Sequence, residues 1–288
     1  MSDKIKHDNY WDIIVKPKSS SLQLNLKEVW AYKDLIVLMV KRDITSVYKQ
    51  TVLGPLWMFI QPIFITAIYT FTFSASAGLS TDGIPPVLFY LIGQTFWVYF
   101  SDCLNKTSNT FISNASVFGK VYFPRLVMPF SVIISGLVKL GLQVILLLAV
   151  YLYYYFTTVD QIQPQWMYFI LLPVIVLIIG LFSLSLGIIF SSFTTKYRDF
   201  TFLLGFAVQL LMFLSFVTFP ASMFSPFKQN LLMCNPIATL METIKFILTG
   251  HGIFSVNYII TALIITLVLF FSSIIVFNRT EKSFMDTV

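Results

Sequence analysis

Six stretches of about 20 predominantly apolar residues recur along the sequence, and they restrict the possible folds more than any other feature. A helix needs ~20 such residues to cross the hydrocarbon core of a bilayer. Only 11% of the residues are charged, whereas a soluble domain has roughly 25%. The sequence therefore predicts an all-α integral membrane protein with six transmembrane helices, near residues 56–77, 86–104, 129–156, 166–193, 202–223 and 256–277.

Lysine and arginine are divided unequally between the segments that separate these spans. Sixteen lie in residues 1–55, in the loops after the second and fourth spans and at the C-terminus, and the opposite loops hold only Lys228 and Lys245. Short cytoplasmic loops carry the excess of basic residues, so both termini are predicted to be cytoplasmic. The first 25 residues lack an apolar core, so no cleavable signal peptide is expected.

The N-terminal region does not fit the spanning pattern. After a polar tail, 1–24, the pair Asn25 and Glu28 has the spacing of a capping box. Apolar residues then recur at helical spacing beside several basic ones, which predicts an amphipathic helix of the cytoplasmic interface within 25–55. Lys41 and Arg42 are candidates for attracting a lipid phosphate, although basic residues beside a membrane also act simply as topology signals.

A second non-spanning segment joins the second and third spans. Phe111, Ala115 and Phe118 form a short apolar stripe that ends at Gly119 and Lys120. Glycine and then proline are the expected stop signals of a helix. A short cytoplasmic helix is predicted over about 105–120.

The third such segment, 224–255, precedes the last span. Asn235 and Pro236 form a good helix start, and Gly250 sits where a C-terminal glycine belongs. The helix between them is too short and too charged to cross, so it is predicted to dip partway into the membrane and return. Glu242 and Lys245 lie apart from its apolar face, either as a polar face toward water or with a role at an exit.

Lys139 lies near the middle of the third predicted span. An ionisable side chain at that depth is costly and is a functional hypothesis by default. Three interpretations are open: the side chain lines a substrate path, pairs with a neighbour, or extends to the cytoplasmic interface.

Motifs for catalysis and for nucleotide binding are lacking. The one Gly-Lys pair, Gly119-Lys120, lacks the other residues of a phosphate-binding loop. Two histidines and two cysteines, Cys103 and Cys234, have no metal-site spacing. No catalytic residue, metal or cofactor is therefore expected in this chain. A nucleic-acid partner is also not expected, because the basic residues flank the spans.

Several stretches together resemble the permease subunits of polysaccharide-export ABC transporters, which move O-antigen, capsule or teichoic-acid chains. The longest is Tyr48–Trp57 (YKQTVLGPLW), and the O-antigen branch is favoured by Trp11–Lys18 (WDIIVKPK). The other matching stretches are Tyr32–Leu35, Lys41–Asp43, Asn114–Ala115, Lys120–Arg125, Lys196–Asp199 and Asn235–Pro236.

The resemblance implies a six-span permease domain over 56–288 in a bacterial inner membrane. It implies a homodimer with two ATPase subunits made as separate chains, which bind ATP and Mg, and a glycan carried on polyprenyl pyrophosphate. Coupling to the ATPase would involve the 105–120 helix and the nearby loops, with candidates Phe111, Ala115, Phe118, Lys120, Arg125, Lys196 and Arg198. Lys41, Arg42, Lys139 and Glu242 are the candidates for the substrate path or for the lipid phosphate.

Other functions remain open. A capsule or teichoic-acid exporter would share these motifs. A secondary transporter would be expected to show embedded acidic residues and repeated halves, and a membrane-bound glycan-modifying enzyme would need clustered histidine, aspartate or arginine. A purely structural anchor would not need the motifs of the cytoplasmic loops.

Overall fold

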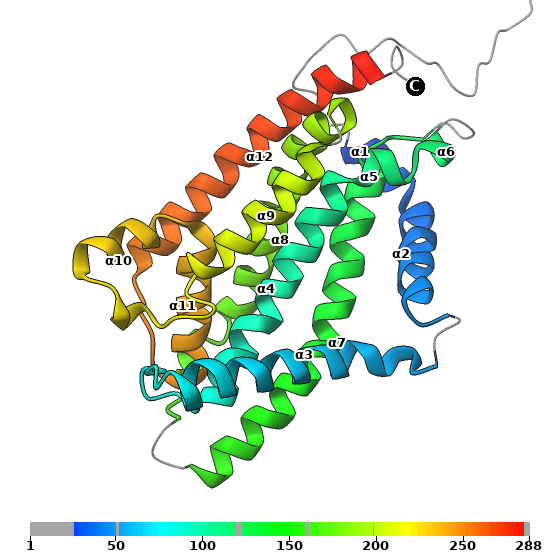
Figure 1. Ribbon diagram of the computed structural model, residues 1–288. Helices are drawn as coiled ribbons and strands as arrows, with labels where there is room; N and C mark the ends of the chain where they lie inside the picture. Colours follow the sequence, from blue (N-terminus) through cyan, green and yellow to red (C-terminus); the bar gives the residue numbers. More distant parts are fainter. Residues whose placement is uncertain (1–25, 50–51, 119–122, 159–161, 198, 285–288) are drawn as a thin grey trace, which may run out of the picture.

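The computed structural model describes residues 26–49, 52–118, 123–158, 162–197 and 199–284, and every regular element in these ranges is helical (Figure 1). The long elements are α2 (Lys33–Tyr48), α3 (Trp57–Tyr69), α4 (Pro86–Ser108), α7 (Val127–Thr157), α8 (Leu171–Lys196), α9 (Asp199–Phe213), α11 (Pro236–Thr249) and α12 (Val256–Phe284). The short ones are α1 (Leu26–Ala31), η1 (Gly54–Leu56), η2 (Thr70–Ser76), α5 (Thr110–Ser113), α6 (Ala115–Phe118), η3 (Trp166–Tyr168), η4 (Ala221–Met223) and α10 (Pro226–Met233).

Within the described residues, five continuous helical stretches are long and apolar enough to cross a bilayer. They are Gly54–Ser76, Pro86–Ser108, Val127–Thr157, Leu171–Lys196 and Val256–Asn278. The first of them runs through η1, α3 and the π-helical η2. The prediction of an all-α membrane protein is confirmed, with a sixth span only if the bent pair of α10 and α11 counts as one.

The fifth predicted span, 202–223, is wrong in its second half. α9 ends at Phe213, and its 15 residues at 1.5 Å each are shorter than the ~30 Å hydrocarbon core. The chain continues without regular structure to Pro220. These residues are apolar because the protein buries them and not because they form a lipid-facing helix: Phe216 and Val217 are fully buried.

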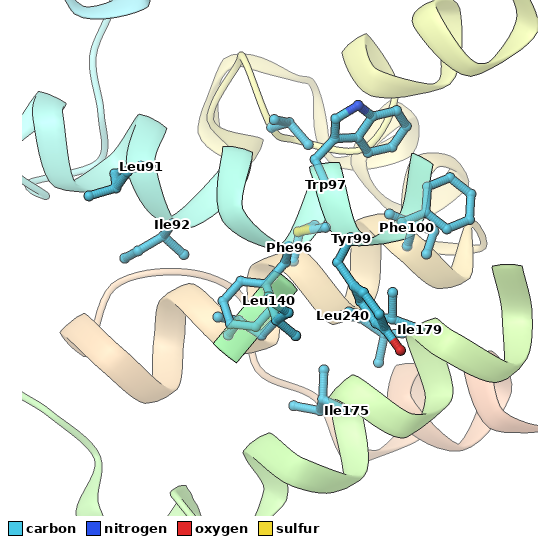
Figure 2. Packing of buried hydrophobic residues seen from close by; sticks show 14 of the residues in the cluster. Leu91, Ile92, Phe96, Trp97, Tyr99, Phe100, Leu140, Ile175, Ile179 and Leu240 are labelled. Atoms are coloured by element: carbon cyan, nitrogen blue, oxygen red, sulfur yellow. The ribbon is translucent and has the colours of Figure 1, made fainter. Parts of the chain in front are cut away.

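α4 is the central helix of the bundle. In its most apolar part 78% of the residues are buried, against 17% for the stretch that contains α3. It packs against α8 and α7, and Figure 2 shows Phe96, Tyr99 and Phe100 of α4 among side chains of the neighbouring helices, such as Leu140 and Ile179. The exposed faces of α3 require lipid or another protein surface as a partner.

The predicted N-terminal amphipathic helix is present as α1 and α2, which are separated at Tyr32. α2 runs beside α7 (Figure 1). Its buried residues Ile36 and Met39 belong to one apolar cluster with Val127 and Met128 of α7.

Several short helices and helix ends lie at opposite ends of the bundle (Figure 1). α1, α5, α6 and the end of α12 lie at one end of the bundle, and α10 lies toward the opposite end. The chain bends by 105° between α10 and α11. This bend lies in the segment that was predicted to re-enter the membrane. The predicted helix ends are confirmed: the Asn235 side chain accepts from the Ile237 amide at 3.1 Å, and Gly250 adopts a left-handed φ of 77°.

Candidate functional site

A cavity of about 380 Å³ opens into the side of the bundle between α3, α4, α7 and α9. We call it the lateral groove. Its lining mixes amide and charged groups with aromatic and apolar ones: Gln61, Ile65, Ile68, Tyr69, Gln94, Trp97, Val98, Ser101, Asp102, Lys139 and Met212. A surface that is partly polar at membrane depth is unsuited to lipid tails and suited to a ligand with hydroxyl groups and apolar faces.

Lys139 is one wall of this groove and forms an ion pair there. Its Nζ lies 2.5 Å from Asp102 Oδ2, and the two side chains keep exposed fractions of 25% and 35%. Of the three interpretations of Lys139, the structure therefore combines pairing with a place in the groove wall. Asp102 was not predicted as the partner of Lys139, although opposite charges in two consecutive spans were a usable signal.

Glu242 and Lys245 do not form a face toward water. Their side chains have exposed fractions of 2% and 1%, and Lys245 Nζ lies 2.8 Å from Glu242 Oε1. A polar face toward water was one of the two interpretations of the helical pattern, but α4, α8, α10 and α12 all pack against α11. Its polar residues are therefore enclosed, and a buried charge of this kind must be paired.

The predicted single helix over 105–120 is wrong. α4 continues to Ser108, and two one-turn helices, α5 and α6, follow. The side chains of Asn109 and Asn114 donate to the backbone carbonyls of Asn105 and Thr110, each at 2.9 Å. Asparagine side chains that bond to the backbone compete with helix continuation, which accounts for a break at each position.

The three apolar candidates of this segment pack mostly against other residues of the same chain. Phe111 has an exposed fraction of 4%, and its ring centroid lies 5.7 Å from that of Phe118 and 5.8 Å from that of Phe277 in α12. Phe118 stacks on Phe123 at 5.4 Å, and Ala115 is half-buried. Among the residues of this segment that the structure describes, Ile112 is the large apolar residue with an exposed side chain, at 45%.

The basic candidates are spread around the same end of the bundle. Lys196 lies at the end of α8 with its ammonium 5.2 Å from the centre of the Tyr197 ring, and Arg125 is half-buried just before α7. Lys120 and Arg198 lie outside the described residues.

Hydrogen bonds that the sequence did not reveal tie these segments together. Thr194 Oγ1 donates to the Ser108 carbonyl at 2.6 Å, and Thr201 Oγ1 donates to Asn109 Oδ1 at 3.2 Å. The junction of α8 with α9 is therefore bonded to the junction of α4 with α5.

Arg42 lines a second open cavity, of about 460 Å³, between α2, α5, α7 and the end of α4. Its Nη1 donates to Asn114 Oδ1 at 3.2 Å, and Arg42 also pairs with Asp43 at 2.8 Å. Lys106 adds a second basic side chain to the lining. Lys41 is exposed.

Comparison with known proteins places these features in a family. The chain is 24% identical to an O-antigen export system permease protein RfbA of Myxococcus xanthus, over 91% of this chain and 98% of the relative. Two proteins of the same name from Klebsiella pneumoniae are 25% and 26% identical, each over 88% of this chain and 94% of the relative. The family model described as ABC-2 type transporter matches residues 34–249, from α2 to the end of α11. The chain belongs to the ABC-2 type transporter family.

Proposed function

We propose that this chain is the channel-forming permease subunit of an ATP-driven exporter that moves polyprenyl-pyrophosphate-linked O-antigen across the bacterial inner membrane. The observation that carries the proposal is the similarity to O-antigen export permeases over nearly the whole of both chains. The lateral groove supports it, because its amide and aromatic side chains offer hydrogen bonds and ring faces to sugars.

The glycan path, in this proposal, includes the lateral groove and is completed by a second copy of the chain. α3 and α9 border the groove, and several of their large apolar side chains are exposed, among them Phe64, Phe202 and Phe206. Asp102 and Lys139 then face the passing sugars as a neutral pair, so the groove presents polar groups without a net charge.

The end of the bundle with α5 and α6 faces the cytoplasm in this proposal, as do both termini. There a separate ATPase, which binds ATP and Mg, contacts the segment around 105–120. The exposed side chains of Ile112 and Tyr197, at 45% and 51%, and that of Lys196 are among the contacts available to it. The buried Phe111 instead transmits movement to α8 and α12, against which it packs.

The cavity beside Arg42 is the proposed place for the pyrophosphate of the lipid carrier. Arg42 and Lys106 supply positive charge, and Ser113 adds a hydroxyl group to the lining. The hydroxyls of Ser46 and Thr110 also line the cavity, but they donate to the backbone carbonyls of Asp43 and Lys106. Arginine is well suited to phosphate because its planar group donates two parallel hydrogen bonds. Lys41, which is exposed on the next position of α2, adds to the attraction at longer range.

Purification in mild detergent tests the proposal. We expect an ATP-binding-cassette ATPase at one-to-one stoichiometry, two chains of each kind, and loss of surface O-antigen when either gene is deleted. Export with no ATPase partner would favour a secondary transporter, and unchanged surface O-antigen with loss of another surface glycan would point to a capsule or teichoic-acid exporter.

Thiol labelling tests the orientation. In a variant with Cys103→Ser and Cys234→Ser, Ser80→Cys is expected to react with an impermeant reagent added outside, and Ser116→Cys only after the membrane is opened. Both positions are exposed. The reverse pattern would contradict the proposed topology.

A further inference from the structure

The stretch between the end of α9 and Pro220 is unwound inside the protein. Its fully buried residues are Ser215, Phe216, Val217 and Thr218. Their backbone groups are not part of a regular helix and its repeating hydrogen bonds. Irregular backbone at membrane depth is tolerated only where protein groups satisfy it. The partners of this stretch therefore determine where α9 ends.

Phe216 has a φ of 53°, in the left-handed region that bulky side chains rarely adopt. A residue held in this way persists only when its surroundings impose the conformation. Here the backbone carbonyl of Phe216 accepts a hydrogen bond from Lys245 Nζ at 2.5 Å. A charged donor from α11 thus holds the unwound stretch at its most strained residue.

The ammonium of Lys245 is itself fixed from two other directions. Glu242 Oε1 accepts from it at 2.8 Å, and the ring centre of Phe89 in α4 lies 4.1 Å away. The second oxygen of Glu242 accepts from the Ile253 amide at 3.2 Å. Gly252 makes this possible, because a Cβ there would lie 2.9 Å from the Glu242 carbonyl oxygen and its φ is 126°.

The unwound stretch leads directly to the lateral groove. Met212, in the last turn of α9, lines the groove and its sulfur accepts from the Tyr69 hydroxyl at 3.8 Å. Farther along, the Phe219 ring lies 5.8 Å from that of Phe73 and 6.1 Å from that of Phe213. A shift of residues 214–220 would therefore move α9 and η2, and η2 continues the groove-lining helix α3.

We propose that Lys245 is a positioning residue for transport: by holding the Phe216 carbonyl, it fixes the end of α9 and with it the wall of the lateral groove. Glu242 orients the ammonium and neutralises its charge. This role rests on the proposed function, since it assigns a task in export. It differs from a purely stabilising ion pair, which would need Glu242 and Lys245 to satisfy only each other.

A variant that lacks both charges distinguishes a positioning role of Lys245 from a purely stabilising ion pair. Lys245→Met alone leaves a buried carboxylate unpaired, so its failure to fold would be uninformative. Glu242→Gln with Lys245→Met removes that penalty, as neutral replacement of a buried pair generally does, but it still leaves the Phe216 carbonyl without its donor. Lys245→Arg keeps a charged donor. Lys228→Met is the matched control, a lysine of the same external segment that is exposed.

The position of residues 214–220 is measured by the accessibility of a single introduced cysteine to a thiol reagent. Val217→Cys, in a background of Cys103→Ser and Cys234→Ser, places a thiol at a site with an exposed fraction of 0%. A small impermeant methanethiosulfonate reagent is added outside whole cells, and surface glycan is measured in parallel at matched permease abundance without Val217→Cys.

With Glu242→Gln and Lys245→Met together, we expect normal membrane abundance, labelling of residue 217 at least tenfold faster than in the parent, and at least tenfold less surface glycan. Lys245→Arg should restore most of the protection, and Lys228→Met should change neither measurement. Parent-like protection and export in the doubly neutral variant would overturn the proposal. If the parent exports no glycan, the proposed function fails, but the labelling still decides whether Lys245 fixes the stretch.

Discussion

Arg42 of α2 donates a hydrogen bond to Asn114, between α5 and α6, across 72 positions of sequence. The amphipathic N-terminal helix and the proposed ATPase-contacting segment are therefore bonded directly. A displacement of α5 and α6 would reach α2, and α2 in turn packs on α7. In the proposed function this links the ATPase contact to the cavity for the lipid phosphate.

Arg42→Ala is expected to lower surface glycan several-fold, because it removes both the bond to Asn114, worth about 1 kcal/mol, and a phosphate-binding group. Lys41→Ala is the matched control, since Lys41 is exposed at the neighbouring position. Surface glycan is compared at equal permease abundance. Equal effects of the two substitutions would show that only general positive charge matters there.

Phe111→Ala and Ile112→Ala should affect different properties. Phe111 is buried, so its truncation should cost ~3–5 kcal/mol of stability. Ile112 is exposed, so its truncation should change stability by no more than about 0.5 kcal/mol while reducing ATPase co-purification. Thermal unfolding in detergent and the amount of ATPase retained on the purified permease are the two measurements. Full ATPase retention by Ile112→Ala would remove this side chain from the proposed contact.

The ion pair of Asp102 and Lys139 is expected to be needed as a pair. Lys139→Met should reduce surface glycan strongly, because it leaves an uncompensated carboxylate in the groove. The charge-exchanged variant, Asp102→Lys with Lys139→Asp, should recover much of the loss, and so should Asp102→Asn with Lys139→Met. Lack of recovery in both double variants, at normal abundance, would mean that Lys139 itself contacts the substrate.

Close packing of α4 on α8 predicts a sharp difference between two glycines. A Cβ at Gly187 would lie 2.5 Å from Cβ of Thr107, whereas a Cβ at Gly141 has no atom within 4 Å. Gly187→Ala should destabilise the protein by ~1–3 kcal/mol. Gly141→Ala should be neutral or stabilising by up to ~1 kcal/mol, because alanine favours helix more than glycine. Melting temperatures in one detergent would test this, and equal values would contradict the tight packing.

Hydropathy predicted most of the spanning helices, because a span is recognised from about 20 consecutive apolar residues and needs no knowledge of distant contacts. Hydropathy failed after Leu214, where Phe216, Val217 and Ala221 are buried by neighbouring protein and not by lipid. Periodicity placed α11 correctly, but it could not reveal that other helices cover every side of it. Burial of this kind depends on contacts between distant segments.

The sequence identified single residues of the candidate site, but it did not show which residues contact one another. Lys139 stood out because a charge at membrane depth is rare. Asp102 in the preceding span was a usable signal for its partner, but only the packing of α4 on α7 shows that the two side chains meet. Phe111 and Phe118 were correctly grouped as one apolar face, and the structure shows that this face packs largely on α2, α8 and α12. Hydrogen bonds such as Thr194 to Ser108 leave no sequence signal.

The π-helical turns of η2 affect how the first span tolerates changes in length. The Ala77 amide donates to the carbonyl of Thr72, five residues earlier, at 3.1 Å, so these turns hold an extra residue relative to an α-helix. Removal of one residue between 70 and 76 could restore α-helical turns and keep the two flanking parts facing their present neighbours. In α4, loss of one residue would rotate everything beyond it by about 100°. Among proteins of this kind, differences in length within the first span are therefore expected at η2, and α4 should keep a constant length.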